Sequence, residues 1–478
     1  MKLKVAIFFF LSNLLNTAAM AEENVYEDVS NLIDAWLEGQ KDFEDIPSIV
    51  GMVVKDQQIL WSGAFGESNQ ATAQAMTVNT LTSVCSVSKV FTATATMKLV
   101  DDGQLELDAP ISKLLPRLSL KQVFPEGGEI TVRSLLTHSS GVPRDTNHNY
   151  WGAPDHHFPT ESELYEFLSE SQTIHAVDSS VAYSNVGYAL LGQVIEHASG
   201  KTYKDYVEEE LFEPIGMKDS VVELPKSLIG SEHAVGYTAR NRDGTRKQAN
   251  MYQAHSMQSA VGISTTVMDL ARFAMWQFRV AGANDSEVLD ASSLLSMYDT
   301  QAENSRGADR GLGYQVSVDS DGNRWVEHGG ICPGYVSYLK MDVSNKIAYA
   351  IMINANQVRA LAYVNGLIEI INRAESDGLL ANTPARPDLT EYTGFYDVNP
   401  WNSEYYVGQW GQDLMLLYFP AESLQYALYQ YRRLEGDVFQ LVEDGRVTDS
   451  QIEFIRDQSG EVVSVKDGGQ YHGRIRTL

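Results

Sequence analysis

The chain has few cysteines and few basic residues, and each shortage excludes a class of protein. Cys85 and Cys332 are the only cysteines in 478 residues, which excludes a fold held together by many disulfides. We expect both to be small buried thiols, with a single bridge as the alternative in an oxidising compartment. Lys and Arg number 36 against 63 Asp and Glu, a net charge of −27. This balance argues against nucleic acid and anionic membrane surfaces as partners.

Several catalytic and ligand-binding motifs are missing as well. The chain has no Gly-x-Ser-x-Gly, which disfavours an α/β-hydrolase, and no His-Glu-x-x-His or Cys-x-x-Cys. Gly200–Thr202 resembles the end of a phosphate-binding loop, but Ile195 stands where the first glycine belongs. His156 and His157 lie in a surface loop, 147–159, without Cys or paired carboxylates at ligand spacing. We therefore expect neither a metal nor a cofactor.

Beyond the N-terminus, no stretch is apolar for long enough to span a membrane. The N-terminus has a basic start at Lys2 and Lys4, a short apolar core over Val5–Leu11 and a small-x-small site at Ala19–Ala21. This order is typical of a cleavable signal peptide over residues 1–21, with a buried N-terminal helix as the alternative. We expect a periplasmic or secreted protein.

Hydrophobic periodicity predicts an α+β protein followed by an all-β module. The expected helices are 24–37, 83–100, 130–137, 161–170, 187–198, 203–211, 267–278 and 361–374. The expected strands of the first part are 49–54, 59–65, 324–329, 335–343 and 347–353. The expected strands of the module are 405–407, 414–418, 425–429, 438–442, 451–455 and 462–465. Short strands at this spacing predict a sandwich or a barrel.

A change of composition divides the chain into two domains after the signal peptide. We expect a larger domain over residues 22–378, a linker over 379–390 that contains Pro384 and Pro387, and the β module over 391–478.

Ser86 and Lys89 form a Ser-x-x-Lys motif in the expected helix 83–100. Residues three apart share one face of a helix, so the lysine amine can lie over the serine hydroxyl. A serine hydroxyl is a weak nucleophile until a base takes its proton, and a partly desolvated lysine can lose its charge and become that base. Alone the pair is weak evidence, because two fixed positions arise by chance in a chain this long.

Two further motifs follow in order, Tyr183-Ser184-Asn185 and then His328-Gly329-Gly330. The three motifs together resemble the Ser-x-x-Lys, Tyr-x-Asn and Lys/His-x-Gly motifs of the serine β-lactamase-related family. That family includes class C β-lactamases, DD-peptidases, D-aminopeptidases and esterases. Three other stretches resemble the family pattern: Leu105–Pro110, Leu135–Gly141 and Gly262–Phe273.

The resemblance covers residues 47–374 and implies a fold. This fold is an antiparallel sheet flanked by helices, with a mostly helical subdomain. Residues 391–396 further resemble the start of the lipocalin-like β domain that some members carry. The β module is then expected to cap the cleft or to mediate a homo-oligomer.

The resemblance also implies acyl transfer to Ser86. Lys89 and Tyr183 would share the proton transfers, since a phenol beside a cationic amine can have its pKa lowered enough to act as a base. Asn185 would orient Lys89 and contact the substrate amide. The backbone N–H groups of Ser86 and Ile331 would hold the developing oxyanion.

The third motif is expected to bind substrate through His328, Gly329 and Gly330, with the glycines leaving room beside the strand. Class C β-lactamases resemble Lys-Thr-Gly here, whereas His328 is mostly neutral at neutral pH and so weakens recognition of a carboxylate. We expect a small peptide, amide or ester substrate, most simply a peptide with D-amino acids or a modified terminus. An esterase or a β-lactamase is the alternative within the family. The alternative of another class is a penicillin-binding or sensor protein that is acylated without turnover.

Overall fold

The computed structural model describes residues 26–282, 286–304, 307, 309–381, 386–421, 423–443 and 445–477. The expected signal peptide, 1–21, and part of the expected linker lie outside these residues. The chain divides into two compact units. The large unit is Ile46–Val364, and the barrel unit combines the chain up to Asp45 with the chain from Asn365 onward. The domain bounds expected from composition stay a prediction.

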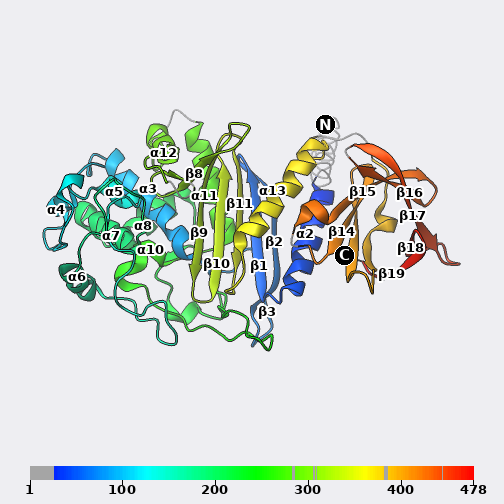
Figure 1. Cartoon of the computed structure of the whole chain (residues 1–478), viewed down its shortest axis with the longest axis horizontal. Helices are drawn as coiled ribbons and strands as arrows, with labels where there is room; N and C mark the ends of the chain where they lie inside the picture. Colours follow the sequence, from blue (N-terminus) through cyan, green and yellow to red (C-terminus); the bar gives the residue numbers. More distant parts are fainter. Residues whose placement is uncertain are drawn as a thin grey trace, which may run out of the picture. The chain divides into compact units, whose positions relative to one another are not determined.

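An antiparallel eight-stranded sheet forms the frame of the large unit (Figure 1). Its strand order is β3-β2-β1-β11-β10-β9-β8-β7. The strands are β1 (Ser48–Lys55), β2 (Gln58–Asn69), β3 (Gln74–Ala75), β7 (Asp309–Arg310), β8 (Gln315–Val318), β9 (Arg324–Cys332), β10 (Tyr335–Asp342) and β11 (Ile347–Ile353). The central strands β1 and β11 are buried on both faces, which explains their nearly continuous apolar sequences. Helix α11 (Val267–Ala281) packs against both of them.

The hairpin of β9 and β10 positions the third motif. Its register pairs His328 with Leu339 and Gly330 with Ser337. The three consecutive strands expected here are confirmed, although β9 continues three residues beyond the predicted end, to Cys332. This extension carries Ile331 along the edge of the cleft described below.

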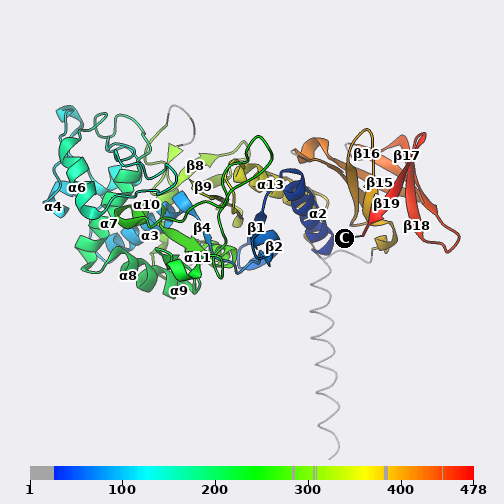
Figure 2. The same cartoon turned by 90° about the horizontal axis from the view of Figure 1, so that it is seen from below.

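A mostly helical subdomain lies beside the sheet (Figures 1 and 2). Its central helices, which contact one another, are α3 (Ser88–Asp101), α5 (Val132–Leu136), α7 (Asn185–Ser199) and α10 (Gln258–Val261). Around them lie α4 (Ile111–Leu114), α6 (Glu161–Glu170), α8 (Tyr203–Val207), α9 (Glu213–Ile215) and α12 (Ala291–Tyr298). A small antiparallel sheet joins β4 (Thr82–Ser83), β5 (Val221–Val222) and β6 (Ile263–Thr265).

Helix α3 is buried on nearly all sides although it contains several hydroxyl side chains. The hydroxyls of Thr92, Thr94 and Thr96 each donate to the backbone carbonyl four residues earlier, at 2.8–3.2 Å. Buried hydroxyls of this kind are tolerated because they are hydrogen-bonded. The small side chains let neighbouring helices approach α3 on every side.

The expected helix over 83–100 begins later than predicted. Thr82–Ser83 is strand β4, and Cys85–Val87 is a 3₁₀ turn that leads into α3. Ser86 therefore lies on the turn, while Lys89 lies in the first turn of the helix. The boundary moved because Ser83 pairs with Ser264 of β6, a tertiary contact that overrides local periodicity.

The β module is a closed barrel of eight antiparallel strands, which decides between the two expected architectures. The strands are β12 (Gly394–Asp397), β13 (Glu404–Trp410), β14 (Asp413–Phe419), β15 (Leu428–Glu435), β16 (Val438–Glu443), β17 (Arg446–Arg456), β18 (Val462–Asp467) and β19 (Gln470–Arg476). The first and last strands were not expected. β12 has only four residues, and β19 is mostly polar and exposed. The interior of the barrel is filled by packed side chains that include Tyr396, Tyr405, Phe439 and Phe454.

Helix α2 (Glu27–Phe43) belongs to the barrel unit and contacts β13 and β14. It ends six residues later than expected, because Gly39 packs against Phe419 and the Gln40 side chain accepts a hydrogen bond from the Ala421 N–H at 2.8 Å. Helix α13 (Ala360–Ser376) also runs slightly beyond its predicted ends.

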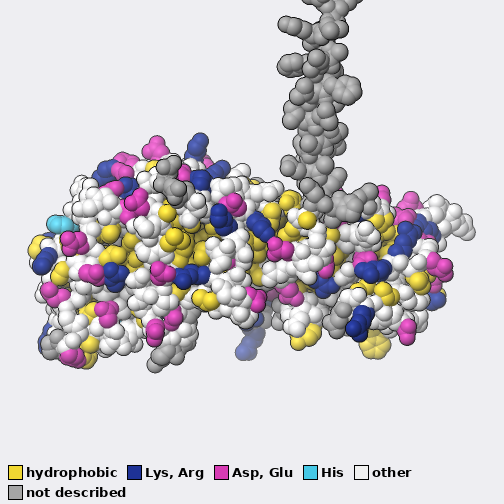
Figure 3. All heavy atoms as spheres, turned by 90° about the horizontal axis from the view of Figure 1, so that it is seen from above, with side chains coloured by type: hydrophobic (Ala, Val, Ile, Leu, Met, Phe, Trp, Pro, Cys, Tyr) yellow, Lys and Arg dark blue, Asp and Glu magenta, His cyan; other side chains and the backbone are white. Residues whose placement is uncertain are grey.

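Figure 3 shows acidic and basic side chains interspersed over one face of each unit, without a region of a single sign. Among the described residues, no helix is both long and apolar enough to cross a membrane.

Candidate active site

A cleft of about 610 Å³ in the large unit brings the three motifs together. Among the residues that line it are Ser86, Tyr183, His328, Gly329, Gly330 and Ile331. These come from the turn before α3, the segment before α7 and the strand β9. Lys89 and Asn185 are buried behind the cleft wall.

Lys89 is wholly buried beside Ser86. Its Nζ lies 3.3 Å from the Ser86 Oγ and donates to the carbonyl of Ala260 at 2.8 Å. Burial lowers the pKa of Lys89 well below its usual value, and the nearby carboxylate of Asp145 only partly opposes this effect. Burial therefore favours the neutral form of the amine next to the serine hydroxyl.

Tyr183 does not have the lowered pKa expected from its sequence context. Burial raises its pKa to about 12, although a hydrogen bond with Ser86 acts in the opposite direction. The Lys89 Nζ lies 4.9 Å from the centroid of the phenol ring. The expectation was wrong because the desolvation of the phenolate outweighs the nearby positive charges. Tyr183 stays protonated at neutral pH.

His328 is neutral, as expected. Its Nδ1–H donates to the carbonyl of Gly329 at 2.8 Å, which leaves Nε2 as an acceptor. Burial, together with the neighbouring Lys89, lowers the pKa of His328 to about 3. The side chain can therefore orient a donor but supplies no positive charge.

The two glycines of the third motif serve different purposes. A Cβ on Gly330 would lie 2.2 Å from the carbonyl oxygen of Val84 and 2.5 Å from the Ser337 Oγ. A Cβ on Gly329 would instead meet the ring of Tyr338 at 2.9 Å. The explanation that Gly330 leaves room for substrate is incomplete, because the strand also passes very close to the turn that carries Ser86.

Asn185 is held by Asp145 rather than by Lys89. Its Nδ2 donates to Asp145 Oδ1 at 2.7 Å, and in the described part of the chain no hydrogen bond joins it to Lys89. The Asn185 Oδ1 is buried and has no hydrogen-bond partner among the described residues. This atom lies behind the cleft wall, because Asn185 is buried and is not among the residues that line the cleft.

Cys85 and Cys332 form a disulfide, not the two free thiols that we favoured from sequence. The two cysteines are 247 residues apart in sequence, so their closeness could not be predicted. In the fold, β9 lies beside the turn before α3, and the two Cα atoms are 5.6 Å apart. Cys85 also has a φ of +51°, in the left-handed region that residues other than glycine rarely adopt. The residue next to Ser86 thus combines an unusual backbone conformation with a covalent link to β9.

His138 is a residue whose role the sequence did not indicate. It is buried, its ring centroid lies 4.4 Å from that of Tyr183, and its Nδ1 accepts from the Ser184 N–H at 3.1 Å. Burial lowers the pKa of His138 well below its usual value. A neutral His138 therefore fixes the segment that presents Tyr183. Its position in the family-like stretch Leu135–Gly141 was the only available signal.

Arg144, Arg310 and Arg359 also line the cleft, and no motif in the sequence marks them. No Asp or Glu is among the described residues of the lining. Arg144 donates to Asp145 at 3.1 Å, and its guanidinium lies 5.2 Å from the Tyr183 ring centroid. The Nε of Arg310 is buried without a hydrogen-bond partner among the described residues. The lining is positive in a chain whose net charge is −27.

The sequence model of the β-lactamase family matches residues 33–371, and the chain belongs to this family.

The chain is similar to curated proteins over part of their length. It is 30% identical to the β-lactamase-like protein 2 of Dictyostelium discoideum over 201 residues, which is 41% of this chain and 36% of that protein. It is 31% identical to the D-alanyl-D-alanine-carboxypeptidase/endopeptidase AmpH of Escherichia coli over 157 residues, which is 33% of this chain and 40% of that protein. The matched region is thus well under half the length of either relative.

A solved structure, the octameric penicillin-binding protein homologue from Pyrococcus abyssi, resembles the fold with a TM-score of 0.64 at 22% identity. The likeness covers 92% of this chain and 99% of that one. It extends over the sheet, the helical subdomain and the barrel.

Proposed function

We propose that the protein is a serine hydrolase that forms an acyl-enzyme on Ser86 and cleaves peptides or amides with a free carboxylate near the scissile bond. Peptides that contain D-amino acids are the expected class, as with the relatives named D-alanyl-D-alanine carboxypeptidases. The observation that carries this proposal is the wholly buried Lys89 amine at 3.3 Å from the Ser86 hydroxyl.

In the proposed acylation, the Ser86 Oγ attacks the carbonyl carbon and its proton passes to the neutral Lys89 amine. The carbonyl π electrons move to oxygen, and the backbone N–H groups of Ser86 and Ile331 stabilise the resulting oxyanion. Lys89 is suited to this role because burial already disfavours its charged form. The positive charge it gains is balanced by the negative charge of the oxyanion.

Collapse of the tetrahedral intermediate releases the leaving amine, which must take up a proton. Tyr183 is protonated at neutral pH and shares a hydrogen bond with Ser86, so it can donate that proton and recover one from Lys89. Water then attacks the acyl-enzyme by the reverse sequence. His328 Nε2 is an acceptor on the cleft wall that would hold a substrate N–H group.

The arginines support a substrate with a negative charge. Arg310 has a buried Nε without a partner among the described residues, and an arginine guanidinium binds a carboxylate through paired hydrogen bonds. This charge comes from Arg310 and Arg144 rather than from the third motif, where His328 is neutral. The expected weakness in carboxylate recognition is thereby offset.

Acyl-enzyme mass spectrometry during turnover tests the proposal. The substrate panel contains D-Ala-D-Ala peptides, D- and L-amino-acid anilides, short p-nitrophenyl esters and a chromogenic cephalosporin. We expect steady turnover of a D-amino-acid peptide with transient acylation of Ser86, and none with Ser86→Ala. A Ser86→Ala protein that keeps full activity would refute the mechanism.

The alternatives give different results in the same panel. Turnover of esters alone indicates an esterase, and turnover of the cephalosporin alone indicates a β-lactamase. A stoichiometric burst without turnover indicates a penicillin-binding or sensor protein.

The disulfide supports export to the periplasm or the medium, because disulfides persist in oxidising compartments. Mass spectrometry of the mature N-terminus tests the expected cleavage after residue 21. Sedimentation of the full chain tests the homo-oligomer, and a form truncated after Ala374 tests the part played by the β module.

A further inference from the structure

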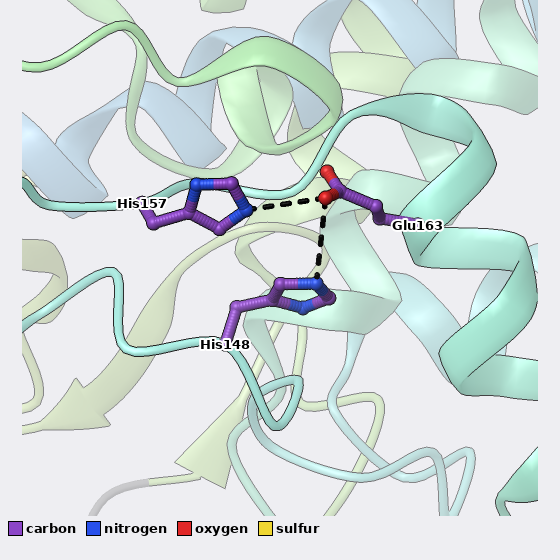
Figure 4. A group of neighbouring side chains, drawn as sticks. All are labelled: His148, His157 and Glu163. Carbon is purple, nitrogen blue, oxygen red and sulfur yellow. Dashed lines mark hydrogen bonds and ion pairs between the residues drawn. The ribbon is translucent and has the colours of Figure 1, made fainter.

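Three potential metal ligands meet outside the cleft, between the loop 147–159 and the start of helix α6. They are His148, His157 and Glu163, whose ligand atoms all lie within 4.8 Å of one another (Figure 4). His148 and His157 come from the loop, and Glu163 comes from the first turn of the helix. None of the three is among the residues that line the cleft.

The distances are close to those of a tetrahedral zinc site. The Nε2 atoms of His157 and His148 lie 3.2 and 4.0 Å from Glu163 Oε1. Zinc bonds of about 2.0–2.2 Å in tetrahedral geometry place two ligand atoms roughly 3.3–3.6 Å apart. The first pair already fits, and the second needs a movement of only a few tenths of an ångström.

The surrounding hydrogen bonds prepare the ligands for a cation. Nδ1–H of His148 can donate to the Thr146 hydroxyl at 3.2 Å, which leaves the Nε2 lone pair directed toward Glu163. The other oxygen of Glu163 accepts from the Thr160 N–H at 2.8 Å and from the Thr160 hydroxyl at 2.9 Å. Oε1 is the oxygen that faces the two imidazoles, and a metal would take the place of its present contact with His157 Nε2.

We propose that His148, His157 and Glu163 bind one zinc ion, with water as the fourth ligand, and that this ion stabilises the loop 147–159. A set of two imidazoles and one carboxylate suits zinc better than magnesium or calcium, which prefer oxygen ligands. The site is structural, because its ligands lie away from Ser86 and the other residues of the cleft.

The sequence did not reveal this site because the adjacent pair was misleading. Of His156 and His157, only His157 joins the cluster; His156 is buried, and its Nδ1 lies 3.3 Å from the carbonyl of Tyr150. The other two ligands lie nine residues before and six residues after His157, on different elements. The three ligands do not follow the short, regular spacing of known metal-binding motifs, so the sequence predicted no metal.

Zinc at this position would act on the cleft wall indirectly. Asp145 lies three residues before His148 and accepts hydrogen bonds from Asn185 and Tyr150. A metal bound to His148, His157 and Glu163 would cross-link the loop that follows Asp145 to helix α6. The ion therefore limits the movement of a segment that holds Asn185, whatever substrate the cleft accepts.

The test uses the full mature chain without an affinity tag. Bound metal is first removed from the protein with a chelator, and the protein is then dialysed against micromolar zinc. Elemental mass spectrometry measures the zinc content per chain. We expect one zinc per chain and a cobalt form with the visible absorption of tetrahedral coordination. His148→Ala and Glu163→Gln should each weaken zinc binding at least about tenfold.

Glu163→Gln is informative because glutamine can still form the capping box of α6 and so preserve the fold. His197→Ala, which removes an exposed histidine elsewhere, is the matched control and should bind zinc normally. Zinc should also slow proteolysis within 147–159 in the wild type and not in Glu163→Gln. A wild-type chain that takes up no zinc, or binding that both ligand variants retain, overturns the proposal.

Discussion

Cys85 and Cys332 are joined by a disulfide, and each is the chain neighbour of a residue proposed to bind the oxyanion. Cys85 precedes Ser86, and Cys332 follows Ile331. The two backbone N–H groups come from elements far apart in sequence, the turn before α3 and the strand β9. The covalent link sets the distance between those elements directly at the site.

Replacing both cysteines with alanine should lower kcat about tenfold while KM changes little, because misplaced oxyanion donors affect the transition state more than the bound substrate. The free energy of unfolding should fall by about 2–5 kcal/mol. Kinetics and urea unfolding measure the two effects. Reduction of the wild type should reproduce them, and the double variant should not respond to reductant. A fully reduced wild type with unchanged kcat would contradict this role.

Lys89→Met should lower kcat/KM at least about 100-fold, because the base is lost while the volume of the side chain is kept. In the wild type, kcat/KM should rise with pH, since Lys89 acts only when deprotonated. Burial lowers its pKa, so the rise should occur well below the usual lysine value. A pH–rate profile of both proteins checks this, with circular dichroism to confirm folding. A profile without a rise below pH 10 would exclude Lys89 as the base.

Acid should destabilise the large unit through its buried histidines. Burial lowers the pKa of His328 and of His233 to about 3, against an ordinary value of 6.5. The unfolded chain therefore binds more protons between these values, so this contribution is complete above pH 6.5 and is lost as pH falls toward 3. Each group contributes roughly 1.4 kcal/mol per pH unit within that window.

Urea unfolding between pH 4.5 and 7 measures this dependence. His233→Gln should reduce the slope, and the exposed His197→Gln should leave it unchanged. An identical slope in the wild type and His233→Gln would show that His233 is not held neutral.

Arg310→Ala should lower kcat/KM about 10- to 100-fold for a substrate with a free carboxylate, since hydrogen bonds to charged groups contribute about 1.5–3 kcal/mol. The amide-capped form of the same substrate should be cleaved at nearly the wild-type rate. Arg310→Lys should restore part of the difference. Equal losses on the two substrates would mean that Arg310 supports the fold rather than the carboxylate.

Gly329→Ala and Gly330→Ala form a matched pair. The added methyl at residue 330 meets the Val84 backbone, which cannot move without shifting Ser86, whereas at residue 329 it meets a side-chain ring. We expect Gly330→Ala to destabilise the protein by about 1–3 kcal/mol and to slow acylation, and Gly329→Ala to have the smaller effect. Thermal unfolding and the acylation rate of both variants measure the contrast. A larger effect of Gly329→Ala than of Gly330→Ala would show that the contact between residue 330 and the Val84 backbone does not limit the site.

Periodicity and motif order predicted the architecture of the large unit, and six of the eight residues predicted for the site line the cleft in the structure. Periodicity and motif order depend on residues that are near one another in the sequence, so they can be recognised without the structure. The misses depend on contacts between distant segments. Desolvation of Tyr183 reversed the expected pKa shift, and the closeness of Cys85 to Cys332 follows from strand register. The three arginines of the cleft belong to no sequence motif, because a long side chain can bring a positive charge to the cleft from many positions in the chain.

The barrel misses have a similar cause. Strand β12 has four residues and β19 is polar, so neither shows the alternation that marks an amphipathic strand. Closure of the barrel supplies them with partners, since β12 pairs with β19. Pairing of the first strand with the last is a property of the finished barrel and not of either segment.

The barrel unit is built from both ends of the chain, which has a consequence for the order of synthesis. Trp36 of α2 packs against Gly366, and Gly39 packs against Phe419, so α2 has no partners in its own unit until the C-terminal residues have been made. The large unit is continuous in sequence and can fold as it emerges from the ribosome. Helix α2, although made early, is therefore among the last elements to dock, because its partners Gly366 and Phe419 are made after the large unit.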